Sequence, residues 1–233
     1  MQKPPVSKAN DKYEFTDFFK VFMGRRVWRI RCCRTGKYGG WLERESNLDI
    51  LGACWVDDEA VVCSGAIVSE DALVSEYAMI HGSALVTGSA RVYGSGQVSG
   101  DAIVLDSARV YAHAHVFENA EVSGSAKISG GVEVMGRAFI SESASISGSA
   151  LATDDVEIRG SARIHGEARI ADKAWVCGLA VVSGHSVVSG ESAIHGNAQI
   201  GGSVVASGTA EFFSESYWAG AWDNGLHPFP VTT

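Results

Sequence analysis

Histidine is the side chain in this sequence best suited to acid–base chemistry, because its imidazole titrates near neutral pH. Six histidines lie between residues 80 and 200, at positions 81, 113, 115, 165, 185 and 195. We expect most of them to be ordinary surface residues and single out His115 and His81 as candidate general bases. His113 and His115 have no third ligand beside them in the sequence, so no metal site is predicted.

A second chemical pattern places cations beside aromatic or polar side chains. At multiples of 18 residues the sequence has Arg91 with Tyr93, Arg109 with Tyr111, Lys127 with Ser129, and Arg163 with His165. Such groups in line on one face can hold a phosphate-bearing ligand or an acidic partner strand. The alternative is a solvated face whose charge is balanced by acidic residues at neighbouring corners.

A third row of residues is apolar and shares the 18-residue spacing. It consists of Ile67, Leu85, Ile103 with Leu105, Phe139 and Trp175. Large apolar side chains in a contiguous row are costly to leave in water. We therefore expect an interface between copies of the chain, most simply in a trimer, or cover by a terminal segment.

These rows depend on a six-residue repeat that runs from Ile50 to about Phe212 without interruption. From Val56 to Ile200, 24 of 25 positions in register are Val or Ile. Two residues before the aliphatic position 20 of 26 residues are Ala, and two residues after it 16 of 22 are Gly. Six residues turn an α-helix by about 600°, which would point successive aliphatic side chains in different directions. The repeat therefore excludes a helix.

An extended strand fits the repeat, because alternate side chains of a strand share a face. The Ala and the Val or Ile then point inward. The Gly or acidic residue lies at a corner, where Gly accepts a positive φ and Asp hydrogen-bonds its own turn. The pattern predicts an all-β fold, a single-stranded parallel β-helix of about nine triangular coils stacked ~4.8 Å apart.

Two stretches of the sequence resemble known proteins. The units Val122-Ser-Gly-Ser-Ala-Lys127 and Ile164-His-Gly-Glu-Ala-Arg169 resemble the hexapeptide repeat of left-handed β-helix proteins. Residues 39–48, Gly-Gly-Trp-Leu-Glu-Arg-Glu-Ser-Asn-Leu, followed by Cys54-Trp-Val-Asp-Asp-Glu-Ala60, are similar to the start of the repeat in bacterial YdcK-like hexapeptide proteins, usually described as transferases. The resemblance implies a left-handed coil, whereas bactofilin-like filament proteins use a comparable repeat in a right-handed one.

The resemblance also implies a homotrimeric acyltransferase. In hexapeptide acyltransferases a histidine in the cleft between subunits acts as general base, and acyl-CoA is the substrate. Their catalytic groups usually lie on or beside a loop that interrupts the repeat. Here the repeat is continuous from residue 56 to residue 212, which argues against catalysis.

Both ends of a β-helix need caps, because they expose a sheet edge and an apolar bore. We divide the chain into a basic capping segment (1–49), the β-helix (50–212) and an aromatic capping tail (213–233). In the first segment, residues 18–34 predict a hairpin whose aromatic face plugs the first coil. The aromatic residues expected to plug the last coil are Phe212, Phe213, Tyr217, Trp218, Trp222 and Phe229.

Composition narrows the class of protein. With 46% hydrophobic residues the 233-residue chain is too apolar for disorder, and its 27 Gly do not suit a helical bundle. No apolar run approaches the ~20 residues of a membrane span, and the N-terminus lacks the pattern of a signal peptide, so we expect a cytoplasmic protein that binds no membrane. Five cysteines without paired spacing fit a reducing compartment.

Charge and repeat together leave two functions open. Residues 1–50 hold 11 Lys or Arg against 6 Asp or Glu, and residues 51–233 hold 8 against 21, so a nucleic-acid partner is not expected. We expect a non-catalytic β-helical scaffold that presents its rows to a protein partner or to its own copies and needs no cofactor. The alternative is the acyltransferase, with acyl-CoA as its substrate.

Overall fold

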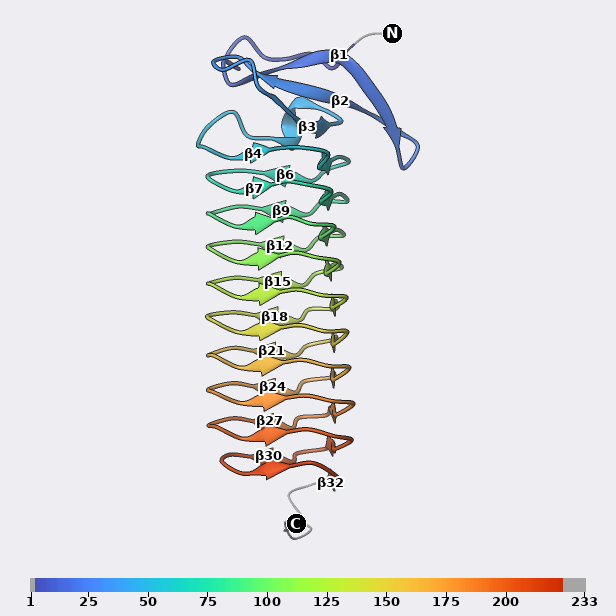
Figure 1. Cartoon of the computed structure of the whole chain (residues 1–233), viewed down its shortest axis with the longest axis vertical. Helices are drawn as coiled ribbons and strands as arrows, with labels where there is room; N and C mark the ends of the chain where they lie inside the picture. The colour runs from blue at the N-terminus through green and yellow to red at the C-terminus, as the bar shows by residue number, and fades with distance from the viewer. Residues whose placement is uncertain (1–2, 224–233) are drawn as a thin grey trace. The chain divides into compact units, whose positions relative to one another are not determined.

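The computed structural model describes residues 3–223 of a chain that divides into two compact units, unit 1 (Met1–Glu118) and unit 2 (Asn119–Thr233). Each unit is an all-β solenoid of stacked coils whose strands pair in parallel with those of the next coil (Figure 1). The only helix in residues 3–223 is one 3-10 turn, η1 (Glu45–Asn47), so no described helix has the length and apolar composition of a membrane span.

Unit 1 begins with three strands joined in antiparallel order and continues as coils. Its strands are β1 (Tyr13–Phe22), β2 (Arg25–Cys32), β3 (Tyr38–Leu42), β4 (Trp55–Val56), β5 (Val61–Val62), β6 (Ile67–Val68), β7 (Leu73–Val74), β8 (Met79–Ile80), β9 (Leu85–Val86), β10 (Arg91–Val92), β11 (Gln97–Val98), β12 (Ile103–Val104), β13 (Arg109–Val110) and β14 (His115–Val116). We name the three sides face A (β5, β8, β11, β14), face B (β6, β9, β12) and face C (β4, β7, β10, β13).

Unit 2 consists of coils throughout its described residues. Its strands are β15 (Glu121–Val122), β16 (Lys127–Ile128), β17 (Glu133–Val134), β18 (Phe139–Ile140), β19 (Ser145–Ile146), β20 (Leu151–Ala152), β21 (Glu157–Ile158), β22 (Arg163–Ile164), β23 (Arg169–Ile170), β24 (Trp175–Val176), β25 (Val181–Val182), β26 (Val187–Val188), β27 (Ala193–Ile194), β28 (Gln199–Ile200), β29 (Val205–Ser207), β30 (Glu211–Phe212), β31 (Ser216–Tyr217) and β32 (Ala221–Asp223). The phase of the repeat assigns these strands to the three faces in turn. In this unit, face A consists of β17 and every third strand after it, face B of β15 and every third strand after it, and face C of β16 and every third strand after it.

The all-β solenoid predicted by the repeat is confirmed, but the number of coils differs slightly. The described residues form about ten coils, four in unit 1 and six in unit 2, instead of about nine. The difference arises after Phe212, where β31 and β32 continue the coil with steps of five residues. The six-residue pattern in the sequence ends before these two strands and does not predict them.

The inward positions of the repeat form the core of each unit. Every aliphatic position from Val56 to Ile200 is at most 1% exposed, including Ala152, the one residue there that is not Val or Ile. The Ala two residues earlier, such as Ala108 and Ala126, are also buried. Small and branched side chains thus alternate around the bore.

The corners adopt the left-handed backbone conformation that the sequence predicts, with φ of +58° at Asp106 and +79° at Gly148. At two acidic corners, however, the carboxylate bonds the next coil and not its own turn as expected. Asp172 Oδ2 accepts a hydrogen bond from the Gly190 N–H at 2.8 Å, and Glu70 Oε2 accepts one from the Gly88 N–H at 2.9 Å, each 18 residues further on. Because like corners stack, the nearest unpaired donor lies in the next coil.

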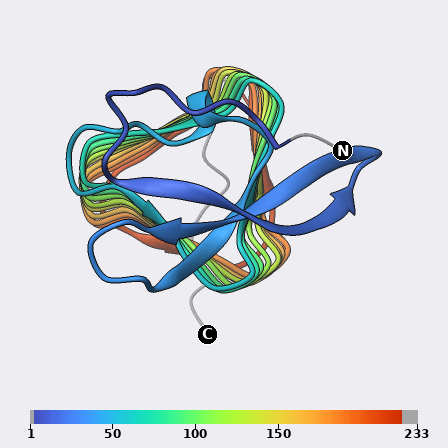
Figure 2. The same cartoon turned by 90° about the horizontal axis from the view of Figure 1, so that it is seen from above.

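The predicted hairpin near the N-terminus is formed by β1 and β2, which cross the end of the first coils and extend past one side (Figure 2). Its buried side chains are different from those expected to plug the coil. Tyr13, Phe15 and Ile30 are at most 5% exposed, whereas Phe18 and Phe19 are 60% and 49% exposed. Phe18 and Phe19 therefore face solvent, whereas Phe22, nearest the turn, is half-buried against Val27 and Trp41.

The last described coil carries a cluster of aromatic rings. Phe212, Tyr217 and Trp222 are at most 8% exposed and meet edge to face, with centroid distances of 4.7 to 5.6 Å. Phe213 and Trp218 are 61% and 60% exposed, so they do not join this cluster. Phe229, the remaining aromatic residue expected in a cap, lies outside the described residues.

Candidate functional site

Face C of unit 1 brings together two of the predicted cations. Arg91 on β10 and Arg109 on β13 are paired in register, because each precedes an inward valine in consecutive coils. Both side chains are exposed. Because their strands are neighbours in a parallel ladder, the backbones of the two arginines lie one coil, ~4.8 Å, apart.

The tyrosines that follow these arginines lie beside the site, and Tyr93 forms part of its wall. The rings of Tyr93 and Tyr111 stack with centroids 5.0 Å apart and planes inclined by 2°. Beside them lies a cavity of about 160 Å³ lined by Arg91, Arg109, Tyr93, Leu73 and Ser75. The cavity therefore presents two cations, an aromatic edge and a hydroxyl.

What distinguishes this pair is that its two cations lie side by side on neighbouring strands with no opposing charge bound to them among the described residues. Arg91 and Arg109 have no ion-pair partner among the described residues, whereas Arg137 of unit 2 pairs with Asp155 at 2.6 Å. Two adjacent positive charges repel, and an anion placed between them would remove that repulsion. The arrangement can thus hold a carboxylate or phosphate group.

The remaining members of the predicted cationic row do not form such a pair. On face C of unit 2, Lys127 and Arg163 are separated by Ser145, which pairs with both in the parallel ladder. His165 follows Arg163 and is exposed. Lys127 and Arg163 therefore do not form a pair with each other.

The candidate general bases His81 and His115 both lie on face A of unit 1. Ser99, which sequence reasoning missed, lies one coil after His81, and its Oγ is 2.9 Å from His115 Nε2. The His115 ring stacks on Phe117 at 4.3 Å, and burial lowers the pKa of His81. Ser99 is 6% exposed, which leaves its hydroxyl little room for a substrate.

The predicted apolar row is continuous in unit 1. Ile67, Leu85 and Ile103 pair in register on face B, with Leu105 beside the last of them. Ile67 is 41% exposed, and Leu85, Ile103 and Leu105 are half-buried, so the row is partly accessible to a partner.

In unit 2 the same row alternates with acidic residues. Glu157 lies between Phe139 and Trp175. The guanidinium of Arg159 lies 5.0 Å from the Trp175 ring centroid, and His195 stacks on that ring at 6.0 Å. Trp175 is thus packed against its own unit and does not continue an apolar surface.

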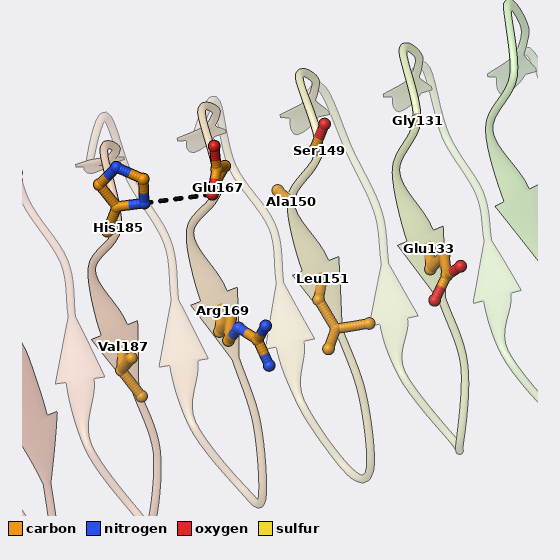
Figure 3. A pocket seen from close by; sticks show the side chains of 9 residues that line it. All are labelled: Gly131, Glu133, Ser149, Ala150, Leu151, Glu167, Arg169, His185 and Val187. Atoms are coloured by element: carbon orange, nitrogen blue, oxygen red, sulfur yellow. Dashed lines mark ion pairs between the residues drawn. The ribbon is translucent and has the colours of Figure 1, made fainter.

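A groove on face A of unit 2 was not anticipated from the sequence (Figure 3). Its volume is about 380 Å³, and its outward row runs Glu133, Leu151, Arg169 and Val187 along β17, β20, β23 and β26. At its rim, His185 Nδ1 lies 3.2 Å from a carboxylate oxygen of Glu167. Because the groove carries charges of both signs, it suits a partner of mixed charge better than a simple anion.

The other residues that line the arginine cavity could also have been predicted from the 18-residue spacing. Ser75 and Leu73 lie one coil before Tyr93 and Arg91, and they complete the cavity. Within residues 3–223, no three His, Cys, Asp or Glu side chains come together as metal ligands.

Comparison of the sequence with protein-family models finds no match, and comparison with curated proteins finds none either. Function is therefore inferred from the geometry of the faces.

Proposed function

We propose that this protein is a non-catalytic β-solenoid scaffold that binds an acidic segment of a partner protein through face C of unit 1. The observation that carries the proposal is the adjacent pair of Arg91 and Arg109, which has no carboxylate partner within the described residues. A carboxylate or phosphate on the partner would bind both guanidinium groups in the cavity they line. The stacked rings of Tyr93 and Tyr111 supply a rigid apolar surface next to the charges.

The scaffold has a second surface for contact with its own copies. The apolar row of Ile67, Leu85, Ile103 and Leu105 lies on face B, a different side of the coil from the arginine pair. Self-association through face B, most simply in a trimer, would therefore leave face C accessible to the acidic segment. Several copies of the anion site in one assembly would raise the avidity for a repetitive partner.

Substitution of the arginine pair tests the binding site. With poly-L-glutamate as the probe, we expect Arg91→Ala and Arg109→Ala each to raise the Kd about tenfold, because each removes charge-assisted hydrogen bonds. Isothermal titration calorimetry at low ionic strength measures the effect. Thermal unfolding of the two variants should match that of the wild type, because both side chains are exposed and form no ion pair.

Arg163→Ala is the matched control. Arg163 has the same outward position in the repeat on face C of unit 2, but its paired neighbours are Ser145 and Val181. We expect this variant to bind the probe within about twofold of the wild type, since it removes one isolated surface charge. An equal loss of affinity in all three variants would show diffuse attraction to cations and would overturn the assignment of a site.

The acyltransferase remains the second candidate, supported by the resemblance to YdcK-like proteins. One observation favours it: burial lowers the pKa of His81, which keeps its imidazole neutral, the form that a general base requires.

The scaffold and the acyltransferase differ in the ligand they need. We expect calorimetry with acetyl-CoA at millimolar concentration to show no binding. Binding that His81→Ala or His115→Ala abolishes, in a protein that light scattering shows to be trimeric, would favour the enzyme over the scaffold.

A further inference from the structure

A second cavity lies in unit 1, between the hairpin and the start of the coils. It has a volume of about 410 Å³ and is lined by Phe18, Phe19, Arg29, Tyr38 and Trp41. Small-molecule sites in proteins are typically cavities of about 300–1,000 Å³ lined by apolar and aromatic groups with a few polar ones. Four aromatic rings and one guanidinium group meet that description.

The walls of this cavity are aromatic side chains that the fold leaves uncovered. Phe18 is 60% exposed, Phe19 49% and Tyr38 44%. The rings of Phe18 and Tyr38 meet edge to face, with centroids 6.2 Å apart. Such rings are costly to leave in water, and their flat surfaces would contact a planar apolar group.

An irregularity in β1 places the two phenylalanines at the cavity. Phe15 pairs with Ile30, but Phe19 pairs with Trp28, so β1 has two more residues than β2 across this interval. Thr16 holds the bulge: its Oγ1 donates a hydrogen bond to the Arg29 carbonyl at 2.9 Å and accepts one from the Phe18 N–H at 3.3 Å. Bulges of this kind redirect side chains and are frequent beside functional sites.

The floor of the cavity is positively charged. Lys20 Nζ lies 4.4 Å from the Trp41 ring centroid, and the Arg29 guanidinium lies 5.2 Å from it. Both cations bind one carboxylate, Glu59, at 3.1 Å and 2.7 Å, which leaves one positive charge unbalanced in this group.

Glu59 remains ionised within this group. Partial burial disfavours its carboxylate, but hydrogen bonds from Lys20, Arg29 and Trp41 outweigh that effect, so the pKa of Glu59 lies below its usual value. The two cations are consequently held in place by a fixed anion, and the surplus positive charge persists near neutral pH.

We propose that this cavity binds a small planar aromatic carboxylate. The aromatic walls select a flat apolar body, and the surplus positive charge at the floor selects a negative group attached to it. The site is independent of Arg91 and Arg109, since it shares no lining residue with their cavity.

The experiment is isothermal titration calorimetry with 2-naphthoate as the probe. We expect binding by the wild type and a rise in Kd of about fivefold to tenfold in Phe18→Ala and in Tyr38→Ala, because each removes one aromatic wall. Tyr77→Ala is the control, since Tyr77 is 67% exposed and lines neither cavity. The absence of 2-naphthoate binding at millimolar concentration, or an equal loss in all three variants, would overturn the proposal.

Two further probes, each lacking one chemical feature of 2-naphthoate, test separately whether the ligand must be charged and whether it must be aromatic. They are used with the wild-type protein, so the result does not depend on how the variants fold. Naphthalene-2-carboxamide keeps the rings and lacks the charge, and cyclohexanecarboxylate keeps the charge and lacks the planar ring. We expect each to bind at least about tenfold more weakly than 2-naphthoate. Amide binding equal to that of the carboxylate would reject the anionic ligand, and equal binding of cyclohexanecarboxylate would reject the aromatic one.

Discussion

Val110→Asp is expected to lower the free energy of unfolding by about 4 kcal/mol, the largest loss we anticipate for a single substitution in unit 1. Val110 is 0% exposed on β13 and is paired with Val92, which is also fully buried. A carboxylate there would face the bore, where the surrounding inward side chains are apolar and offer it no hydrogen-bond donor. Urea denaturation followed by circular dichroism measures the change.

Ser107→Asp provides the control for this substitution. Ser107 lies at the exposed corner shortly before β13, so an added carboxylate there remains hydrated. We expect its free energy of unfolding to stay within about 0.5 kcal/mol of the wild type. Similar losses in both variants would contradict the inward orientation of the aliphatic row.

The fold could be predicted because one short period determines which residues point inward. Every third hexad returns to the same face, so the spacing of Arg91 and Arg109 by 18 residues was enough to place them side by side. The stacked pair of Tyr93 and Tyr111 follows from the same rule. Interactions between equivalent positions of adjacent coils are thus accessible from the sequence.

Properties that depend on local packing were not accessible in this way. Ser123 has an outward position in the repeat and would be chosen from the sequence as a tolerant site, yet it is 7% exposed. The same limit applies to Trp175, whose ring is covered by Arg159 and His195 in neighbouring coils. An outward direction in a closely stacked coil therefore does not ensure contact with water.

The aromatic cavity could not be predicted, because it depends on a break in regularity. Alternation along residues 13–22 would place Phe18 and Phe19 on opposite faces of a regular strand. The bulge held by Thr16 instead brings both rings to one cavity. A periodic pattern carries no signal for such a bulge, since the residues on either side remain ordinary strand formers.

Gly148→Val is expected to destabilise unit 2 by about 2 to 3 kcal/mol, because a β-branched residue is strained where φ is positive. Gly148 has φ of +79°, and a Cβ there would lie 2.6 Å from the Gly166 carbonyl oxygen of the next corner. Gly131→Val is the matched control: its φ is not in the left-handed region, and the nearest atom to an added Cβ, Ser149 Oγ, is 3.8 Å away. Because both variants replace Gly with Val, urea denaturation of the two compares the effect of backbone strain for the same added side chain. A Gly131→Val variant as unstable as Gly148→Val would show that side-chain bulk, and not the corner conformation, limits what the repeat accepts.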